Sequence, residues 1–283
     1  MADSSAISGF ESDALSIERS AHVGTLWLDR PEKRNAMGAG FWDGLPRAVD
    51  ALMEDGETRA IVLAARGKSF SVGLDLAFLN GANEGGIAGN LSGATANLKQ
   101  LETTQRFQRA ISAVAEAPVP VICAVHGFCL GGGLDISTAC DVRLASRDAV
   151  FGVRETRIGI VADVGTLQRL PTIVTAGHMA ELVYTGKDID ATRAEKIGLV
   201  NDVYEDAEAT YQAAFDMATE IAANAPLAVR GTKFILAQGE DLTTEQSLLL
   251  NGIWTMITTL NSKDLQEAMK AFVAKRPPAF KGH

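Results

Sequence analysis

The sequence has little basic charge for its size. Lysine and arginine together number 26 against 35 aspartates and glutamates, which gives a formal net charge of -9. Binding to a nucleic acid requires a clustered basic face, so the composition argues against such a partner. It leaves room for a small anionic ligand, because a few local cations or a helix N-terminus can hold one.

Long hydrophobic runs and the features of a signal peptide are also missing. No stretch approaches the roughly 18–20 apolar residues that span a bilayer. The opening segment, MADSSAISGFESDALS, is polar and acidic, whereas a secretory signal has a basic segment followed by an apolar one. We therefore expect no membrane partner, and the free thiols expected below favour a cytoplasmic protein.

Cysteine is scarce and does not follow a metal-binding pattern. Cys123, Cys129 and Cys140 lie in apolar segments without a CxxC or a Cys/His ligand spacing. We expect three buried free thiols in a reducing compartment and no metal site.

Strands and helices alternate along the first half of the chain. The segments ALSIERS and HVGTLWLD predict two strands that meet near Ala21 and His22, and RAIVLAA, VPVICAV and DVRLAS predict further strands. Residues 41–53 have apolar side chains at helical spacing, with Pro46 expected near the first turn. Over 283 residues this alternation predicts the α/β class.

The rest of the chain is mostly helical after one irregular segment. Residues 80–97 contain five glycines and no apolar period, so we expect a mobile loop there and a helix over residues 98–115. From about Thr166 the pattern is helical in several pieces, with one strand near LVNDVY. The clearest helical periods lie at residues 206–223 and 243–260.

Three consecutive glycines run into a predicted helix in FCLGGGLDISTACD, residues 128–141. Bare backbone at this point lets a ligand approach closely and leaves N–H groups at the positive end of the helix dipole. Such donors suit a phosphate or a developing oxyanion, although tight packing of strand against helix would need the same glycines. The stretch has neither GxGxxG nor GxxxxGK[ST], so a dinucleotide site or a P-loop has little support.

A second glycine follows another strand. The segment KSFSVGLDL, residues 68–76, comes after RAIVLAA and places a glycine where the chain must change direction. Two such loops could each supply one N–H to a single carbonyl oxygen. That arrangement stabilises the enolate of a thioester.

Six segments occur in the order seen in the crotonase superfamily, the enoyl-CoA hydratase/isomerase family, which the chain resembles over nearly its whole length. They are RPEKRNAM (30–37), GKSFSVGLDL (67–76), AVHGFCLGGGLDISTACDVRLAS (124–146), VFGVRETRIGI (150–160), GTLQRLP (165–171) and EAMKAFVAKRPPAF (267–280). The resemblance implies a ββα spiral core over residues 1–200 that binds acyl-CoA. It also implies a helical region over residues 201–283 that builds a homotrimer or hexamer, and no cofactor, because coenzyme A is part of the substrate.

The resemblance also assigns binding roles. The residue after the first-loop glycine and the middle glycine of the triplet donate to the thioester oxygen, which implies Leu74 and Gly132 as the oxyanion hole. RPEKRNAM would follow the pantetheine and nucleotide, with Lys33 or Arg34 near phosphates and Ala36 near the adenine. The remaining residues implied to contact coenzyme A or substrate are Ser71, Gly73, Asp75, Leu76, Gly131 and, toward an adjoining subunit's nucleotide, Phe280 and Lys281.

The acids distinguish members of the family from one another. Hydratases have two glutamates where this chain has Asp135 and Glu155. The shorter side chain retracts the carboxylate by roughly 1.3–1.5 Å, and a misplacement near 1 Å can cost about a hundredfold in rate. Hydratases have a segment similar to PGAGGTQRLP at the position where this chain has ADVGTLQRLP. The segment of this chain contains an additional acid, Asp163.

This combination of three acids resembles the Δ3,5-Δ2,4-dienoyl-CoA isomerase branch. Shifting two conjugated double bonds removes a proton at C2 and delivers one at C6, which two carboxylates can do in turn. We assign that pair to Glu155 and Asp163, without deciding which faces C2, and expect Asp135 to tune or orient its neighbours. An acid facing an acyl pocket is costly to desolvate unless it has such a task.

Other interpretations remain open. The chain could be a 2-enoyl-CoA hydratase that uses Asp135 and Glu155, could run another crotonase reaction such as hydrolysis or carbon–carbon cleavage, or could bind acyl-CoA without catalysis. Each acid also has a purely structural explanation. Asp135 could offset a helix dipole, Glu155 could pair with a neighbouring arginine, and Asp163 could cap the helix that starts near Gly165.

Overall fold

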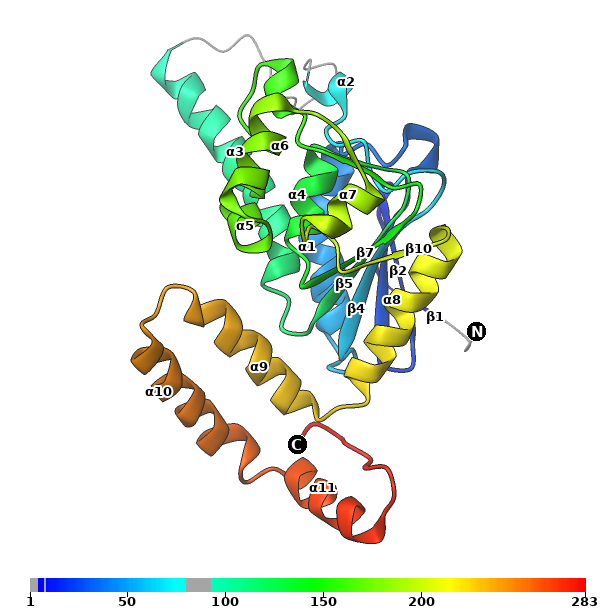
Figure 1. The fold of residues 1–283 in the computed structure, drawn as a ribbon, viewed down its shortest axis with the longest axis vertical. Helices are drawn as coiled ribbons and strands as arrows, with labels where there is room; N and C mark the ends of the chain where they lie inside the picture. The colour runs from blue at the N-terminus through cyan, green and yellow to red at the C-terminus, as the bar shows by residue number, and fades with distance from the viewer. Residues whose placement is uncertain (1–4, 8, 80–92) are drawn as a thin grey trace.

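A mixed sheet forms the centre of the molecule (Figure 1). The computed structural model describes residues 5–7, 9–79 and 93–283. The seven-stranded sheet has the order β1-β2-β3-β4-β5-β7-β10. Its strands are β1 (Ser5–Ala6), β2 (Leu15–Ser20), β3 (Val23–Leu28), β4 (Ala60–Ala65), β5 (Val121–Val125), β7 (Val142–Ser146) and β10 (Asp202–Tyr204). The pairs from β1 to β3 are antiparallel, and those from β3 to β10 are parallel.

The strand predictions for this sheet are confirmed. β2 and β3 meet at Ala21, which adopts a left-handed conformation with φ 51°. Every residue of β4 and β5 is buried, as expected for parallel strands covered on both faces. A second, three-stranded sheet in the order β6-β8-β9 is made of β6 (Phe128–Leu130), β8 (Val150–Gly152) and β9 (Ile189–Asp190).

Helices cover both faces of the large sheet. α1 (Ala39–Met53) packs on one face with α3 (Ala94–Ala115) against it, and α8 (Ala207–Ala222) packs on the other face (Figure 1). The shorter helices are η1 (Pro31–Lys33), α2 (Leu76–Leu79), α4 (Gly132–Thr138), η2 (Glu155–Ile158), α5 (Thr166–Ile173), α6 (Ala176–Thr185) and α7 (Ala191–Lys196).

The last helices form an arm that extends away from the sheet (Figure 1). It consists of α9 (Pro226–Gly239), α10 (Thr244–Trp254), the π-helical segment η3 (Thr255–Thr259) and α11 (Lys263–Ala274). β10 pairs with β7, and α8 packs on β4 and β5, so both belong to the core although they follow residue 200. The arm therefore begins at Pro226.

Two sequence expectations need correction. Pro46 lies inside α1, seven residues after its start at Ala39, and not in the first turn. The helix tolerates the lost N–H because one of its faces is buried against the sheet. α3 begins at Ala94, four residues before the expected start, directly after Gly93 with φ 89°. Most of the expected loop, residues 80–92, lies outside the described residues.

The three cysteines are buried and free, as predicted. None of the helices within the described ranges is long and apolar enough to cross a membrane.

Candidate active site

The site lies where the loops after β3, β4 and β5 meet, at the carboxyl ends of parallel strands. A buried asparagine joins the first two loops. Asn35 is 4% exposed, and its Nδ2 donates to the carbonyls of Arg66 at 2.9 Å and Ser69 at 2.8 Å. Its Oδ1 accepts the N–H of Arg30 at 2.8 Å. The glycine-bearing loop is thus fixed to the preceding loop by side-chain hydrogen bonds.

Ser71 belongs to this scaffold. The side chain is fully buried, its Oγ donates to the carbonyl of Asn35 at 2.8 Å, and the N–H of Gly73 donates to the same Oγ at 3.1 Å. The contact of Ser71 with coenzyme A or substrate that the resemblance implies stays a prediction. Ser71 shapes the turn that presents Gly73 and Leu74.

The predicted oxyanion donors lie side by side. A Cβ built on Gly132 would be 3.8 Å from the nitrogen of Leu74 and 3.6 Å from the Cα of Gly73. Among the described residues, no acceptor takes a hydrogen bond from the N–H of Leu74 or of Gly132. Met37 lies next to these two donors. Its N–H donates to the carbonyl of Gly73 at 2.8 Å. Two free N–H groups this close can both donate to one oxygen.

Glycine is required on both sides of this pair. Gly73 has φ +86°, and a Cβ there would lie 2.7 Å from the carbonyl oxygen of Leu130. Gly131 has φ +51°, and a Cβ there would lie 3.2 Å from Oε1 of Glu155. These glycines therefore allow close packing against a neighbouring loop and a carboxylate, which is the alternative that the sequence left open, and the approach of a ligand stays a prediction.

Asp135 is the most deeply buried of the three acids. It lies in the first turn of α4 at 0% exposure, and its Oδ1 accepts the N–H of Thr166, the first residue of α5, at 2.6 Å. Its Oδ2 has no hydrogen-bond partner in the described part of the chain. Burial raises the pKa of Asp135 to about 6, with Thr166 and the charge of Arg169 acting in the opposite direction.

Glu155 opens η2 beside the glycine triplet. It is 9% exposed, and its Oε2 is buried without a hydrogen-bond partner among the described residues. Burial, followed by the negative charge of Asp135, raises the pKa of Glu155 to about 7. The alternative of a surface ion pair does not hold, because Arg154 binds Asp188 instead. A carboxyl group with this pKa can either accept or donate a proton near neutral pH.

Asp163 lies in the segment between η2 and α5. The residue is exposed as a whole, and its carbonyl accepts Gln108 Nε2 at 2.6 Å. The protein around its carboxyl group still removes enough water to raise the pKa of Asp163. Its negative charge also raises the pKa of Asp135 and of Glu155. Asp163 does not cap α5, because Asp135 takes the N–H of Thr166. The charge of Asp163 therefore acts on both buried acids.

The residues implied to bind coenzyme A differ in their exposure and in whether another side chain already binds them. Lys33 and Arg34 are exposed and Ala36 is half-buried, on the rim beside the glycine loop. Asp75 forms an ion pair with Arg30 at 3.5 Å. The exposed residue that follows it, Leu76, begins α2 and is 60% exposed.

Phe280 and Lys281 lie far from the acids of the same chain. The carbonyl of Phe280 accepts a hydrogen bond from Arg59 Nη2 at 3.0 Å. Arg59 directly precedes β4, so this contact lies at the amino end of the strand, opposite to the site. The N–H of Lys281 donates to Oδ1 of Asp264 at 2.8 Å. Within one chain, this segment cannot join the site. A role toward another subunit stays a prediction.

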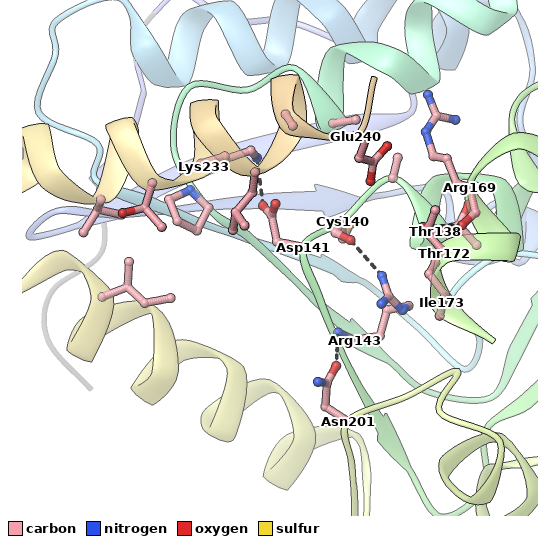
Figure 2. Close-up of a pocket in the computed structure, with 18 of the residues that line it drawn as sticks. Thr138, Cys140, Asp141, Arg143, Arg169, Thr172, Ile173, Asn201, Lys233 and Glu240 are labelled. Carbon is pink, nitrogen blue, oxygen red and sulfur yellow. Dashed lines mark hydrogen bonds and ion pairs between the residues drawn. The ribbon is translucent and has the colours of Figure 1, made fainter. Parts of the chain in front are cut away.

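A large groove lies apart from the three acids, none of which lines it. This groove of about 1020 Å³ lies between α9 and the core, and Figure 2 shows Lys233 and Asp141 on one side of it and Arg169 on another. Lys233 Nζ donates to Asp141 Oδ2 at 2.8 Å. Arg169 is the residue that connects this groove to the site, since it lines the groove and its charge acts on Asp135.

Sequence reasoning missed four residues around the acids. Asn35 and Met37 fix the glycine loop, Thr166 binds Asp135, and Arg169 acts on its charge. Asn35 and Met37 lie inside the motif RPEKRNAM, which could have drawn attention to them. The partners of Thr166 and Arg169 depend on the folded structure. Among the described residues, no group of three or more His, Cys, Asp or Glu is placed to hold a metal ion.

Comparison with known proteins places the chain in a family. The family described as Enoyl-CoA hydratase/isomerase matches residues 18–283. The chain is 37% identical, over 93% of its length and 88% of the relative, to "Delta(3,5)-Delta(2,4)-dienoyl-CoA isomerase, mitochondrial" of Dictyostelium discoideum. It is 36% identical, over 90% of its length and 91% of the relative, to "Delta(3,5)-Delta(2,4)-dienoyl-CoA isomerase, peroxisomal" of Arabidopsis thaliana.

A solved structure gives the same result for the fold. Enoyl-CoA hydratase from Bacillus anthracis superposes with a TM-score of 0.86 at 30% identity, covering 96% of this chain and 100% of that one. The predicted family and the predicted α/β crotonase-type fold with a helical C-terminal region are confirmed. The chain belongs to the enoyl-CoA hydratase/isomerase family.

Proposed function

We propose that this enzyme converts 3,5-dienoyl-CoA into 2,4-dienoyl-CoA. The observation that carries the proposal is a third acid, Asp163, whose charge acts on Asp135 and on Glu155. Relatives that are named Δ3,5-Δ2,4-dienoyl-CoA isomerases, at 35–37% identity, support the same choice. The reaction moves one proton and needs no cofactor beyond the coenzyme A that the substrate carries.

The proposed mechanism follows from the two kinds of group in the site. The thioester oxygen accepts the N–H groups of Leu74 and Gly132, which stabilise the negative charge that develops when a proton leaves C2. One of Glu155 and Asp163 takes that proton, and the electron pair spreads over the dienolate. The other gives a proton to C6, so the product is an isomer of the substrate.

Hydration of a 2-enoyl-CoA is the second candidate. Solved structures named enoyl-CoA hydratase have the same fold, and Asp135 and Glu155 match the positions of the two hydratase acids. One Asp135 oxygen is already bound to the N–H of Thr166 at 2.6 Å, which favours a structural and electrostatic role for this acid. Asp135 therefore has less freedom to hold a water for attack than a longer glutamate would have.

The ultraviolet absorbance of the conjugated 2,4-dienoyl thioester tests the choice. We expect absorbance to grow when the purified protein is mixed with 3,5-dienoyl-CoA, at a rate well above hydration of crotonyl-CoA. Rapid hydration of crotonyl-CoA without formation of the 2,4-diene would favour the hydratase. Binding of both thioesters with turnover of neither would favour a non-catalytic acyl-CoA binder.

We also propose that the arm joins copies of the chain into a trimer or hexamer. No residue of α10 or η3 is buried within one chain. Their exposed apolar residues are Leu248, Leu249, Ile253, Met256 and Ile257. Apolar surface of this extent favours a protein contact. Light scattering gives the native mass, and a monomer at micromolar concentration would contradict the proposal.

A further inference from the structure

The segment that carries Asp163 lies between two glycines with positive φ. Gly159 has φ +78° and Gly165 has φ +132°, conformations in which the chain changes direction at little cost only because these residues are glycines. Between them, Ala162 and Val164 are buried in the core, whereas Asp163 is exposed. The two apolar neighbours therefore hold the segment on the core and leave the side chain of Asp163 outside it.

One hydrogen bond joins this segment to the rest of the chain. Gln108 on α3 donates from its Nε2 to the carbonyl of Asp163 at 2.6 Å. Within the described ranges, no other hydrogen bond reaches residues 161–164 from outside the segment. The helix that supplies this bond is itself fixed, because Phe107 stacks on Trp42 of α1 with 4.3 Å between the ring centroids. The backbone at Asp163 is thus tethered to a well-packed helix by a single side chain.

A second contact of α3 lies on the same face of the helix. Ser112 is four residues after Gln108, so the two side chains project from one side of α3. Ser112 Oγ accepts a hydrogen bond from Arg169 Nη2 on α5 at 2.9 Å. The helix α3 therefore holds the chain on both sides of Gly165, the segment before it through Gln108 and the helix after it through Ser112.

We propose that Gln108 is a positioning residue of the active site, which fixes the Asp163 carboxylate relative to the acyl chain by holding the backbone carbonyl of the same residue. The assignment rests on the proposed function, in which Asp163 is one of the two acids that exchange protons with the dienolate. A displacement near 1 Å of a reacting group can cost about a hundredfold in rate. Loss of the tether should therefore slow the proton transfer at Asp163 and leave the binding of substrate unchanged.

NMR of the intact protein tests the tether without any substrate. Carbon-13 at the aspartate backbone carbonyls together with nitrogen-15 in valine selects the Asp–Val pairs that begin at residues 141, 163 and 202. Asp163→Asn removes one of these signals and thereby assigns it. Gln108→Met keeps the length of the side chain and removes the donor. We expect this variant to move the Asp163 carbonyl signal to higher field, because a hydrogen bond deshields a carbonyl carbon, and to leave the other two signals in place.

Kinetics with 3,5-dienoyl-CoA show whether the tether acts through Asp163. Gln108→Met should lower kcat about tenfold and change KM by less than about twofold. In Asp163→Asn, the same substitution should change the residual kcat by less than about twofold, because residues that act as a unit are not additive. Gln108→Lys supplies another donor and should recover most of the lost kcat.

Gln105→Met is the matched control. Gln105 is exposed one turn earlier on α3, has no hydrogen-bond partner in the described part of the chain, and its substitution should change neither kcat nor the Asp163 signal. An Asp163 signal that stays in place in Gln108→Met overturns the proposal, and so does a loss of kcat that is equally large in the Asp163→Asn background. A protein that fails to isomerise 3,5-dienoyl-CoA contradicts the proposed function instead, and the carbonyl signal then still decides whether Gln108 holds Asp163.

Discussion

Oδ1 of Asp135 on α4 accepts the N–H of Thr166 at the start of α5 at 2.6 Å, so a buried acid of the site also joins two helices. The carboxylate therefore has two separable tasks. One is to satisfy a buried backbone donor, and the other is to supply negative charge beside Glu155.

The first task predicts a difference between two substitutions of Asp135. Asparagine keeps an acceptor for the N–H of Thr166, whereas alanine leaves that donor buried and unpaired. We expect Asp135→Ala to lower the free energy of unfolding by about 1–3 kcal/mol relative to Asp135→Asn. Urea unfolding of both variants measures the difference. Equal stability of the two would contradict the structural task.

The raised pKa of Glu155 predicts a dependence of stability on pH. Its pKa is about 7 in the folded protein against a usual value of 4.5, so the folded state binds the proton more tightly. Stability from this group is present below about pH 4 and is lost as the pH rises through about 7.

Glu155→Gln removes this dependence. We expect the variant to be more stable than the unsubstituted protein by about 2–4 kcal/mol at pH 8.5, and close to it at pH 4. Denaturant unfolding at both pH values checks the sign. A gain that is larger at pH 4 than at pH 8.5 would show that the folded pKa is lowered.

The close approach at Gly73 predicts a loss of both stability and catalysis in Gly73→Ala. The added Cβ would meet the carbonyl of Leu130 at 2.7 Å and the nitrogen of Gly132 at 3.1 Å, in a left-handed conformation. We expect about 2 kcal/mol or more of destabilisation and a fall in kcat of about 10²–10³, because the two N–H donors move apart. Gly177→Ala, where nothing lies within 4 Å, is the matched control and should stay within about 1 kcal/mol.

The exposed cations of the rim predict an effect on binding alone. Lys33 and Arg34 are exposed, and the resemblance places them near the phosphates of coenzyme A. Alanine at both positions should raise KM for a dienoyl-CoA about tenfold and leave kcat nearly unchanged. The same dienoyl group on pantetheine, which lacks the nucleotide phosphates, should show no change in KM. A drop in kcat with the CoA substrate would place these residues closer to the chemistry.

Much of the core was predictable because its signal is local. β4 and β5 are continuous apolar runs bounded by polar residues, and burial on both faces of the sheet requires that pattern. The start of α3 was misplaced because Ala94 to Asn97 carry no apolar period and follow a glycine-rich segment. Pro46 was misplaced because packing of α1 on the sheet outweighs the local cost of proline.

Some residues of the site were likewise predictable from local sequence, and others were not. Glu155, Asp163 and the glycines Gly73 and Gly132 occur in short motifs, so the sequence alone pointed to them. Arg169 is different, because its position depends on contacts with Ser112 and Gly165 that form only in the folded chain. Contacts between distant segments leave no spacing that one sequence could reveal.

The exchange of protons with heavy water tests the central claim, that Glu155 and Asp163 act at the two ends of one dienolate. The unsubstituted protein in heavy water should turn 3,5-dienoyl-CoA into 2,4-dienoyl-CoA with deuterium at C6. Asp163→Asn and Glu155→Gln should each lower product formation by about 10²–10⁴, and one of the two should still exchange the C2 protons of the substrate. Product formed by Asp163→Asn at an undiminished rate, with deuterium at C6, would contradict the account.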